Sequence, residues 1–104
     1  MGSETTEIVI DRGSALVCSV FDVVAKEHGP LFYAINMGLL WRNIDGLMKQ
    51  AQNVSKSDFV VVVHGVITLD RPGRSIDLYD YPNFFTVDRE PISGDTVRLM
   101  TEGK

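Results

Sequence analysis

Four consecutive valines, Val60–Val63, constrain the fold of this 104-residue chain more than any other feature. They lie in the run Phe59–Leu69, whose β-branched residues predict a strand buried on both faces. Pro72 and Gly73 follow the run and predict a turn, because proline fixes φ and glycine tolerates positive φ. The segment Ser75–Tyr81 then returns as the second strand of a β-ribbon.

Residues Pro30–Gln52 predict a long helix. Apolar side chains recur there at intervals of three and four residues, which is the period of one helical face. Pro30 suits the first position of a helix, where no backbone N–H donor is needed. We expect this helix to pack on the sheet and to share a core with it, formed by Leu40, Ile44, Leu47, Val61, Val63 and Ile67.

The segment Ala15–His28 allows two interpretations. Its apolar residues form a helical stripe, and the chain then offers Gly29 as a helix-ending residue and Pro30 as a stop. Its valines favour a strand instead, which would form a hairpin with Ile8–Ile10. We favour the helix because its end signals are complete, and the strand remains the alternative.

Three further short strands are predicted, at Glu7–Asp11, Phe84–Asp88 and Thr96–Thr101. The element order is then β-α-α-β-β-β-β. This order indicates one α+β domain over residues 1–104, in which a small antiparallel sheet of four to five strands packs on one long and one shorter helix. Residues 1–5 and 102–104 are expected to be flexible.

Charge and cysteine content narrow the classes of function. Fourteen acidic and ten basic residues give a net charge of −4, which argues against a domain built to hold duplex nucleic acid. Cys18 is the only cysteine, so no intrachain disulfide can form and a reducing, cytoplasmic location is expected. No apolar run reaches the length of a membrane-spanning helix, so no membrane partner is expected.

His64 is the residue that most invites a catalytic interpretation. If Pro72 and Gly73 form the whole turn, His64 shares a sheet face with Tyr79 and Tyr81. A bulge at Gly65 would shift the faces by one residue. No serine or cysteine nucleophile can be placed beside His64. The other histidine, His28, is expected in a capping position at the end of a helix, where the helix dipole explains its presence. We therefore expect no enzyme activity; a small enzyme using His64 is the third hypothesis.

A second hypothesis comes from a resemblance. The segments Val62–Ile67 and Gly94–Leu99 resemble strands of small Greek-key barrels of the OB type, in which a bulged first strand and a Gly-Asp pair before a later strand are common. The resemblance implies binding of single-stranded nucleic acid by aromatic stacking and basic side chains. The residues that it assigns to stacking are Tyr79, Tyr81, Phe84 and Phe85, and those that it assigns to charge are Arg71, Arg74, Arg89 and Arg98. His64 lies beside Tyr79 and Tyr81 on the expected face.

The favoured hypothesis is a non-catalytic protein-binding domain. The long helix is apolar over more than half of its circumference, so one small sheet cannot cover it. The residues expected at an interface are Leu31, Phe32, Ile35, Leu39 and Trp41. They predict an adaptor or a subunit of an assembly that forms a homodimer. No cofactor is expected, and no metal, because the acidic residues of the C-terminal half lack calcium-loop spacing.

Overall fold

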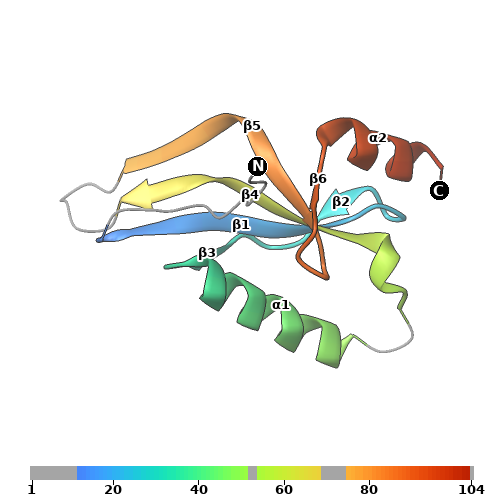
Figure 1. Cartoon of the computed structure of the whole chain (residues 1–104), viewed down its shortest axis with the longest axis horizontal. Helices are drawn as coiled ribbons and strands as arrows, with labels where there is room; N and C mark the ends of the chain where they lie inside the picture. The colour runs from blue at the N-terminus through green and yellow to red at the C-terminus, as the bar shows by residue number, and fades with distance from the viewer. Residues whose placement is uncertain (1–11, 52–53, 69–74, 104) are drawn as a thin grey trace, which may run out of the picture.

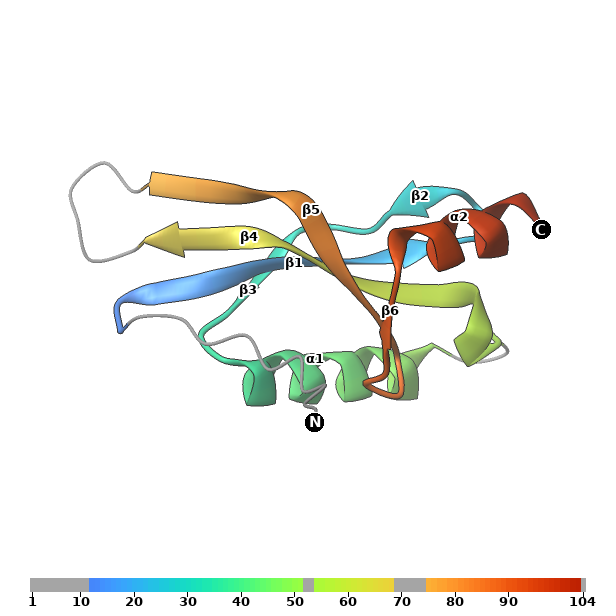
Figure 2. The ribbon, with the colours of Figure 1, turned by 45° about the horizontal axis from the view of Figure 1, so that its top comes forward.

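The structure is a computed structural model that describes residues 12–51, 54–68 and 75–103. It forms an antiparallel sheet with one helix on each face (Figures 1 and 2). The strands are β1 (Ser14–Asp22), β2 (Glu27–His28), β3 (Phe32–Ala34), β4 (Phe59–Thr68), β5 (Ser75–Thr86) and β6 (Pro91–Ile92). The helices are α1 (Met37–Gln50), the single turn η1 (Lys56–Asp58) and α2 (Gly94–Glu102). The predicted α+β class, with a small antiparallel sheet and two helices, is confirmed, although the shorter helix is formed by a different segment from the predicted one.

The sheet is organised around β1 and β4. The strand order is β2-β1-β4-β5-β6, and β3 pairs with β1 on the same side as β2. The segment from β2 to β3 therefore runs along one edge of the sheet, with β6 at the other edge. Because β1 and β4 are flanked on both sides and covered on both faces, most of their residues are buried.

Helix α1 packs on one face of the sheet. Its buried residues Leu40, Trp41 and Ile44 belong to the larger core cluster. Leu16 of β1 and Phe85 of β5 contribute to the same cluster, and the Trp41 and Phe85 rings meet edge to face at 5.5 Å. The predicted core is confirmed for Leu40, Ile44, Val61 and Val63 in this cluster.

Helix α2 packs on the opposite face, over one end of the sheet (Figure 2). Val97 is buried there against Val60 and Val62, which alternate along β4 with the residues that face α1. Ile67 is buried, but it was predicted in the core shared with the long helix, and it lies instead on this second face in a small cluster with Ala15 and Val17. Leu47 was expected in the core, but 43% of its surface is exposed, because it lines an open groove between α1 and the segment from β2 to β3.

The segment Ala15–His28 is a hairpin, so the helix favoured from the sequence is wrong. Strand β1 turns into β2 after Asp22, whose carboxylate accepts hydrogen bonds from the backbone of Val24 and Ala25 at 2.9 and 3.0 Å. Lys26 closes the turn with a φ of 60°. Residues of β1 alternate between two buried faces, and this double burial produced the apolar spacing that resembled a helical stripe.

The long helix begins later than predicted. Residues Phe32–Ala34 form β3, and Asn36 is the N-cap of α1, where its side-chain oxygen accepts a hydrogen bond from the Leu39 N–H at 2.8 Å. Pairing with β1 holds the chain extended up to that cap. The stop near Gln52 agrees with the observed last residue, Gln50, within the usual uncertainty of helix ends.

The last two elements also differ from the prediction. Phe84–Asp88 is not a separate strand, since Phe84, Phe85 and Thr86 continue β5. Thr96–Thr101 is not a strand but part of α2, because the Ser93 hydroxyl caps this helix by accepting from the Thr96 N–H at 3.1 Å. Glu7–Asp11 lies outside the described residues.

The β4–β5 ribbon has a different register from the predicted one. Ile67 pairs with Ile76 and Thr68 with Ser75, whereas a two-residue turn at Pro72 and Gly73 would pair Ile67 with Leu78 and Thr68 with Asp77. The Pro72–Gly73 turn itself lies outside the described residues. The register also shifts between Val63 and Gly65, which is the bulge that was considered as an alternative. Neither helix in the described ranges is long and apolar enough to cross a membrane.

Candidate functional site

A buried serine lies between two histidines on the sheet face opposite α1. The Ser19 hydroxyl oxygen is 3.0 Å from Nδ1 of His28 and 2.8 Å from Nε2 of His64. The centroids of the two imidazole rings are 5.4 Å apart. We call these three residues the serine–histidine cluster.

Each member of the serine–histidine cluster comes from a different strand. Ser19 lies in the centre of β1, while His28 on β2 and His64 on β4 flank it from either side. His64 is the extra residue of the β4 bulge, since Val17 pairs with Gly65 and Cys18 with Val63. The bulge directs the His64 side chain toward β1, an effect for which bulges are known.

Gly65 makes the bulge possible. A Cβ atom at this position would overlap the carbonyl oxygen of Asp77 and would lie 2.7 Å from Cα of Leu78 on β5. Any side chain would therefore push β5 away from β4. The position of His64 thus depends on the glycine that follows it.

Hydrogen bonding couples the protons of the serine–histidine cluster. Ser19 has one hydroxyl hydrogen, so it donates to one imidazole nitrogen, and the other ring must donate to the serine oxygen for both bonds to form. Burial lowers the pKa of His64, and the neighbouring His28 lowers it further. Both causes disfavour a positive charge on His64.

The prediction that no serine lies beside His64 is wrong, because the pairing of β1 with β4 brings Ser19 there. His28 is also misassigned, since it is a strand residue bonded to Ser19 rather than a helix cap. Ser19 is fully buried, so a substrate has no direct approach to its oxygen. Among the described residues, no group of three or more His, Cys, Asp and Glu side chains could hold a metal ion.

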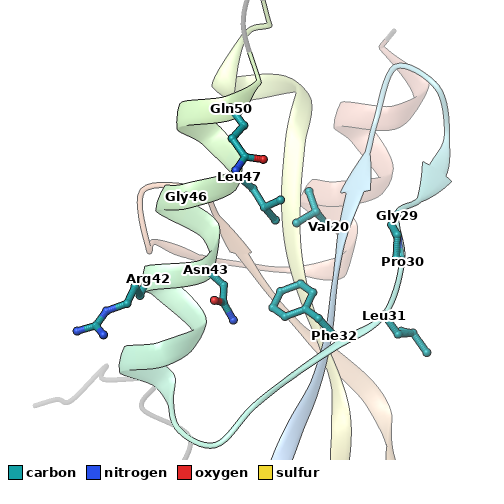
Figure 3. Close-up of a pocket in the computed structure, with 10 residues that line it drawn as sticks. All are labelled: Val20, Gly29, Pro30, Leu31, Phe32, Arg42, Asn43, Gly46, Leu47 and Gln50. Carbon is teal, nitrogen blue, oxygen red and sulfur yellow. The ribbon is translucent and has the colours of Figure 1, made fainter.

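A second site is an open groove of about 530 Å³ on the face of the sheet that α1 covers. It lies between α1 and the segment from β2 to β3 (Figure 3). Val20, Pro30 and Phe32 line its sheet wall. Asn43, Gly46 and Leu47 line its helix wall. The space beside Gly46 is empty, since a Cβ atom there would meet nothing within 4 Å.

The sheet edge above this groove is apolar. No residue from Pro30 to Met37 carries a charge. Leu31, Tyr33 and Ile35 are 60%, 52% and 58% exposed, although each is large and hydrophobic. In the described part of the chain β3 pairs only with β1, so its outer backbone groups face outward. We call Leu31, Phe32, Tyr33 and Ile35 the apolar edge.

The structure brings together only part of the predicted interface. Leu31, Phe32 and Ile35 lie on the apolar edge rather than on a helix. Leu39, on α1, is partly buried against the main core. Trp41 is 8% exposed, with the Arg89 guanidinium 5.8 Å from its ring, and is therefore a core residue in this chain. Tyr33 also belongs to the apolar edge, although it was not among the predicted interface residues.

The predicted nucleic-acid face is not assembled. His64 faces Ser19, whereas Tyr79 packs on the core of the opposite face, where burial and the nearby Cys18 raise its pKa. Tyr81 is 86% exposed. Arg71 and Arg74 lie outside the described residues. Because the register of β4 and β5 shifts between Val63 and Gly65, neither tyrosine pairs with His64.

Comparison of this chain with family models, curated proteins and solved structures finds no match. Its function is therefore argued from the two sites described above.

Proposed function

We propose that this chain is a non-catalytic protein-binding domain that forms a homodimer through the apolar edge and the groove beside it. One observation carries the proposal: an uncharged sheet edge exposes more than half of three large hydrophobic side chains, those of Leu31, Tyr33 and Ile35. Sheet edges in monomeric proteins are normally protected by charges or by covering segments. An edge without charges is suited to pairing with another chain.

A second copy of the chain is the partner that this edge fits most simply. Two antiparallel copies of β3 related by a two-fold axis would join their sheets, and each copy would present the same patch to the other. The backbone donors and acceptors along the edge would then be paired, and Leu31 and Tyr33 would leave water. The groove offers space beside the edge for side chains of the partner.

Burial supports the non-catalytic part of the proposal. The nucleophile candidate Ser19 is enclosed by the sheet, and both imidazole rings already bond its oxygen. We also propose a cytoplasmic location. The free and buried thiol of Cys18 supports it, because cysteines stay reduced in the cytosol.

A pair of matched variants tests the interface. Leu31 on the edge and Leu99 on α2 are 60% and 61% exposed, so replacing either with lysine removes the same apolar surface. We expect Leu31→Lys to shift the chain to monomer, because the lysine charge would be desolvated in the joined edge. Leu99→Lys is expected to leave the dimer intact. Light scattering after size-exclusion chromatography measures the mass, and circular dichroism checks the fold.

Equal masses for wild type, Leu31→Lys and Leu99→Lys at every concentration would contradict the proposed interface. An effect of Leu99→Lys with none of Leu31→Lys would place the contact on α2 instead. If the wild-type chain is a folded monomer that binds a different protein, the homodimer proposal is wrong and the apolar edge belongs to a heteromeric complex.

A further inference from the structure

We propose that His28 and His64 form a binding site for one late first-row transition-metal ion, Cu²⁺, Ni²⁺ or Zn²⁺. The geometry points to this because two imidazole nitrogens on different strands converge on one point. Nδ1 of His28 and Nε2 of His64 lie 3.0 and 2.8 Å from the same oxygen atom, that of Ser19. The site is independent of the proposed dimer, since the apolar edge plays no part in it.

The donor chemistry selects the metal class. Neutral imidazole nitrogen binds zinc at about 2.0–2.1 Å and is a common ligand of copper and nickel. Calcium and magnesium prefer oxygen donors, and no carboxylate is bonded to the serine–histidine cluster in the described part of the chain. Two nitrogens without a carboxylate therefore favour the late transition metals.

The two histidines differ in how far the sheet restricts their side chains. His64 is half-buried in the bulge, and Gly65 keeps β5 close behind it. His28 is exposed on the edge strand β2, where its ring lies 4.8 Å from the Phe21 ring. A small movement of the exposed His28 ring would bring both nitrogens to bonding distance of one ion. Water can reach the ion from the exposed side and complete its coordination.

Ser19 has a positioning role in this site. Its hydroxyl bonds both ring nitrogens in the absence of metal and so directs them toward each other. A neutral hydroxyl is a weak ligand beside imidazole. The affinity is therefore expected to come from the histidines, with the hydroxyl setting their orientation.

Calorimetric titration of the full chain with NiCl₂, CuCl₂ or ZnCl₂ in a non-chelating buffer at about pH 7.5 tests the site, because protons compete little with metal ions for an imidazole nitrogen there. We expect one ion per chain. His28→Gln changes an exposed side chain and is expected to fold, and it should weaken binding by at least roughly tenfold, the factor that even outer-shell changes produce. His64→Gln should do the same, and Ser19→Ala should retain binding.

Histidine side-chain NMR provides the second readout. Addition of Zn²⁺ should shift the ring signals of His28 and His64 together, at one equivalent. Absence of saturable binding by all three ions would overturn the proposal. Binding that survives His28→Gln with unchanged affinity, or that is lost in Ser19→Ala but kept in His28→Gln, would also overturn it.

Discussion

Two glycines of this chain have opposite structural roles. Gly65 is required, because a Cβ atom there would overlap the Asp77 carbonyl oxygen on β5. Gly46 is not required by packing, because a Cβ atom there meets nothing within 4 Å. The same substitution should therefore have opposite effects at the two positions.

Gly65→Ala is expected to destabilise the chain by about 3 kcal/mol or more, since β4 and β5 must separate to admit the methyl group. Gly46→Ala is its matched control and should stabilise α1 by about 0.5–1 kcal/mol, the usual gain for alanine over glycine within a helix. Urea unfolding followed by circular dichroism measures both. Equal effects of the two substitutions would show that the bulge does not depend on Gly65.

Cys18 should respond to alkaline pH. Burial raises the pKa of its thiol from 9.0 to about 12, so the native state keeps a proton that the unfolded state loses. This contribution to stability is complete below pH 9.0 and is lost as the pH rises toward about 12. We expect the free energy of unfolding to fall across that window, and less steeply in Cys18→Ala. Thiol reagents should modify Cys18 only in denaturant, and modification of the native chain would contradict its burial.

The helix caps make a prediction at the scale of one element. Asn36 accepts a hydrogen bond from the backbone of Leu39, so Asn36→Ala should cost about 1 kcal/mol of stability. Asn43 lies in the exposed middle of α1 and makes no cap, so Asn43→Ala is the control and should be neutral or stabilising. Chemical denaturation gives both values. A loss at Asn43 as large as that at Asn36 would contradict the assigned start of α1.

Three elements were predictable from the sequence because their signals are local. The valine run gave β4, and the apolar spacing from Met37 onward gave most of α1. The segment Ser75–Tyr81, which follows the Pro72–Gly73 turn signal, was predicted as the strand that forms the first part of β5. β-branched composition identifies β4, a helical period identifies α1 and a preceding turn signal identifies β5, and each of these signals is local in the sequence.

The hairpin of β1 and β2 was missed for a physical reason. Strand β1 is buried on both faces, so it shows no alternation of apolar and polar residues. Continuous apolar sequence fits a helical stripe equally well. Asp22 was the available signal for the turn, because its carboxylate bonds the backbone two and three residues later.

Helix α2 has helix-end signals in its sequence that compete with its β-branched residues. Ser93 is a good N-cap, Asp95 lies in the first turn, and Gly103 follows the last residue. The β-branched residues between them favoured a strand. Pairs of opposite charge one turn apart also mark this helix, with Arg98 3.7 Å from Asp95 and 3.6 Å from Glu102.

At the scale of the whole molecule, the serine–histidine cluster could not be predicted. Ser19 and His28 meet through a hairpin that was assigned to a helix, and His64 is 45 residues from Ser19 in the sequence. Their meeting depends on β1 pairing with β4 and on the bulge, both of which are long-range features. Leu31, Phe32 and Ile35 were predicted as interface residues by their hydrophobicity alone, although the element that carries them was not.

The arrangement of the layers explains why this molecule has an unprotected edge. Helices α1 and α2 cover opposite faces of the sheet, and in the described residues no strand pairs with the outer side of β3. Leu31, Tyr33 and Ile35 are thus left exposed by the fold itself. We propose that a second copy of the chain covers these three side chains.

Sedimentation equilibrium of the wild-type chain tests this claim most directly. At about 100 μM, a concentration that populates complexes with micromolar dissociation constants, we expect a mass near twice the chain mass of 11.6 kDa. Dilution should return the mass to that of one chain. A mass of 11.6 kDa across the whole concentration range would contradict the homodimer.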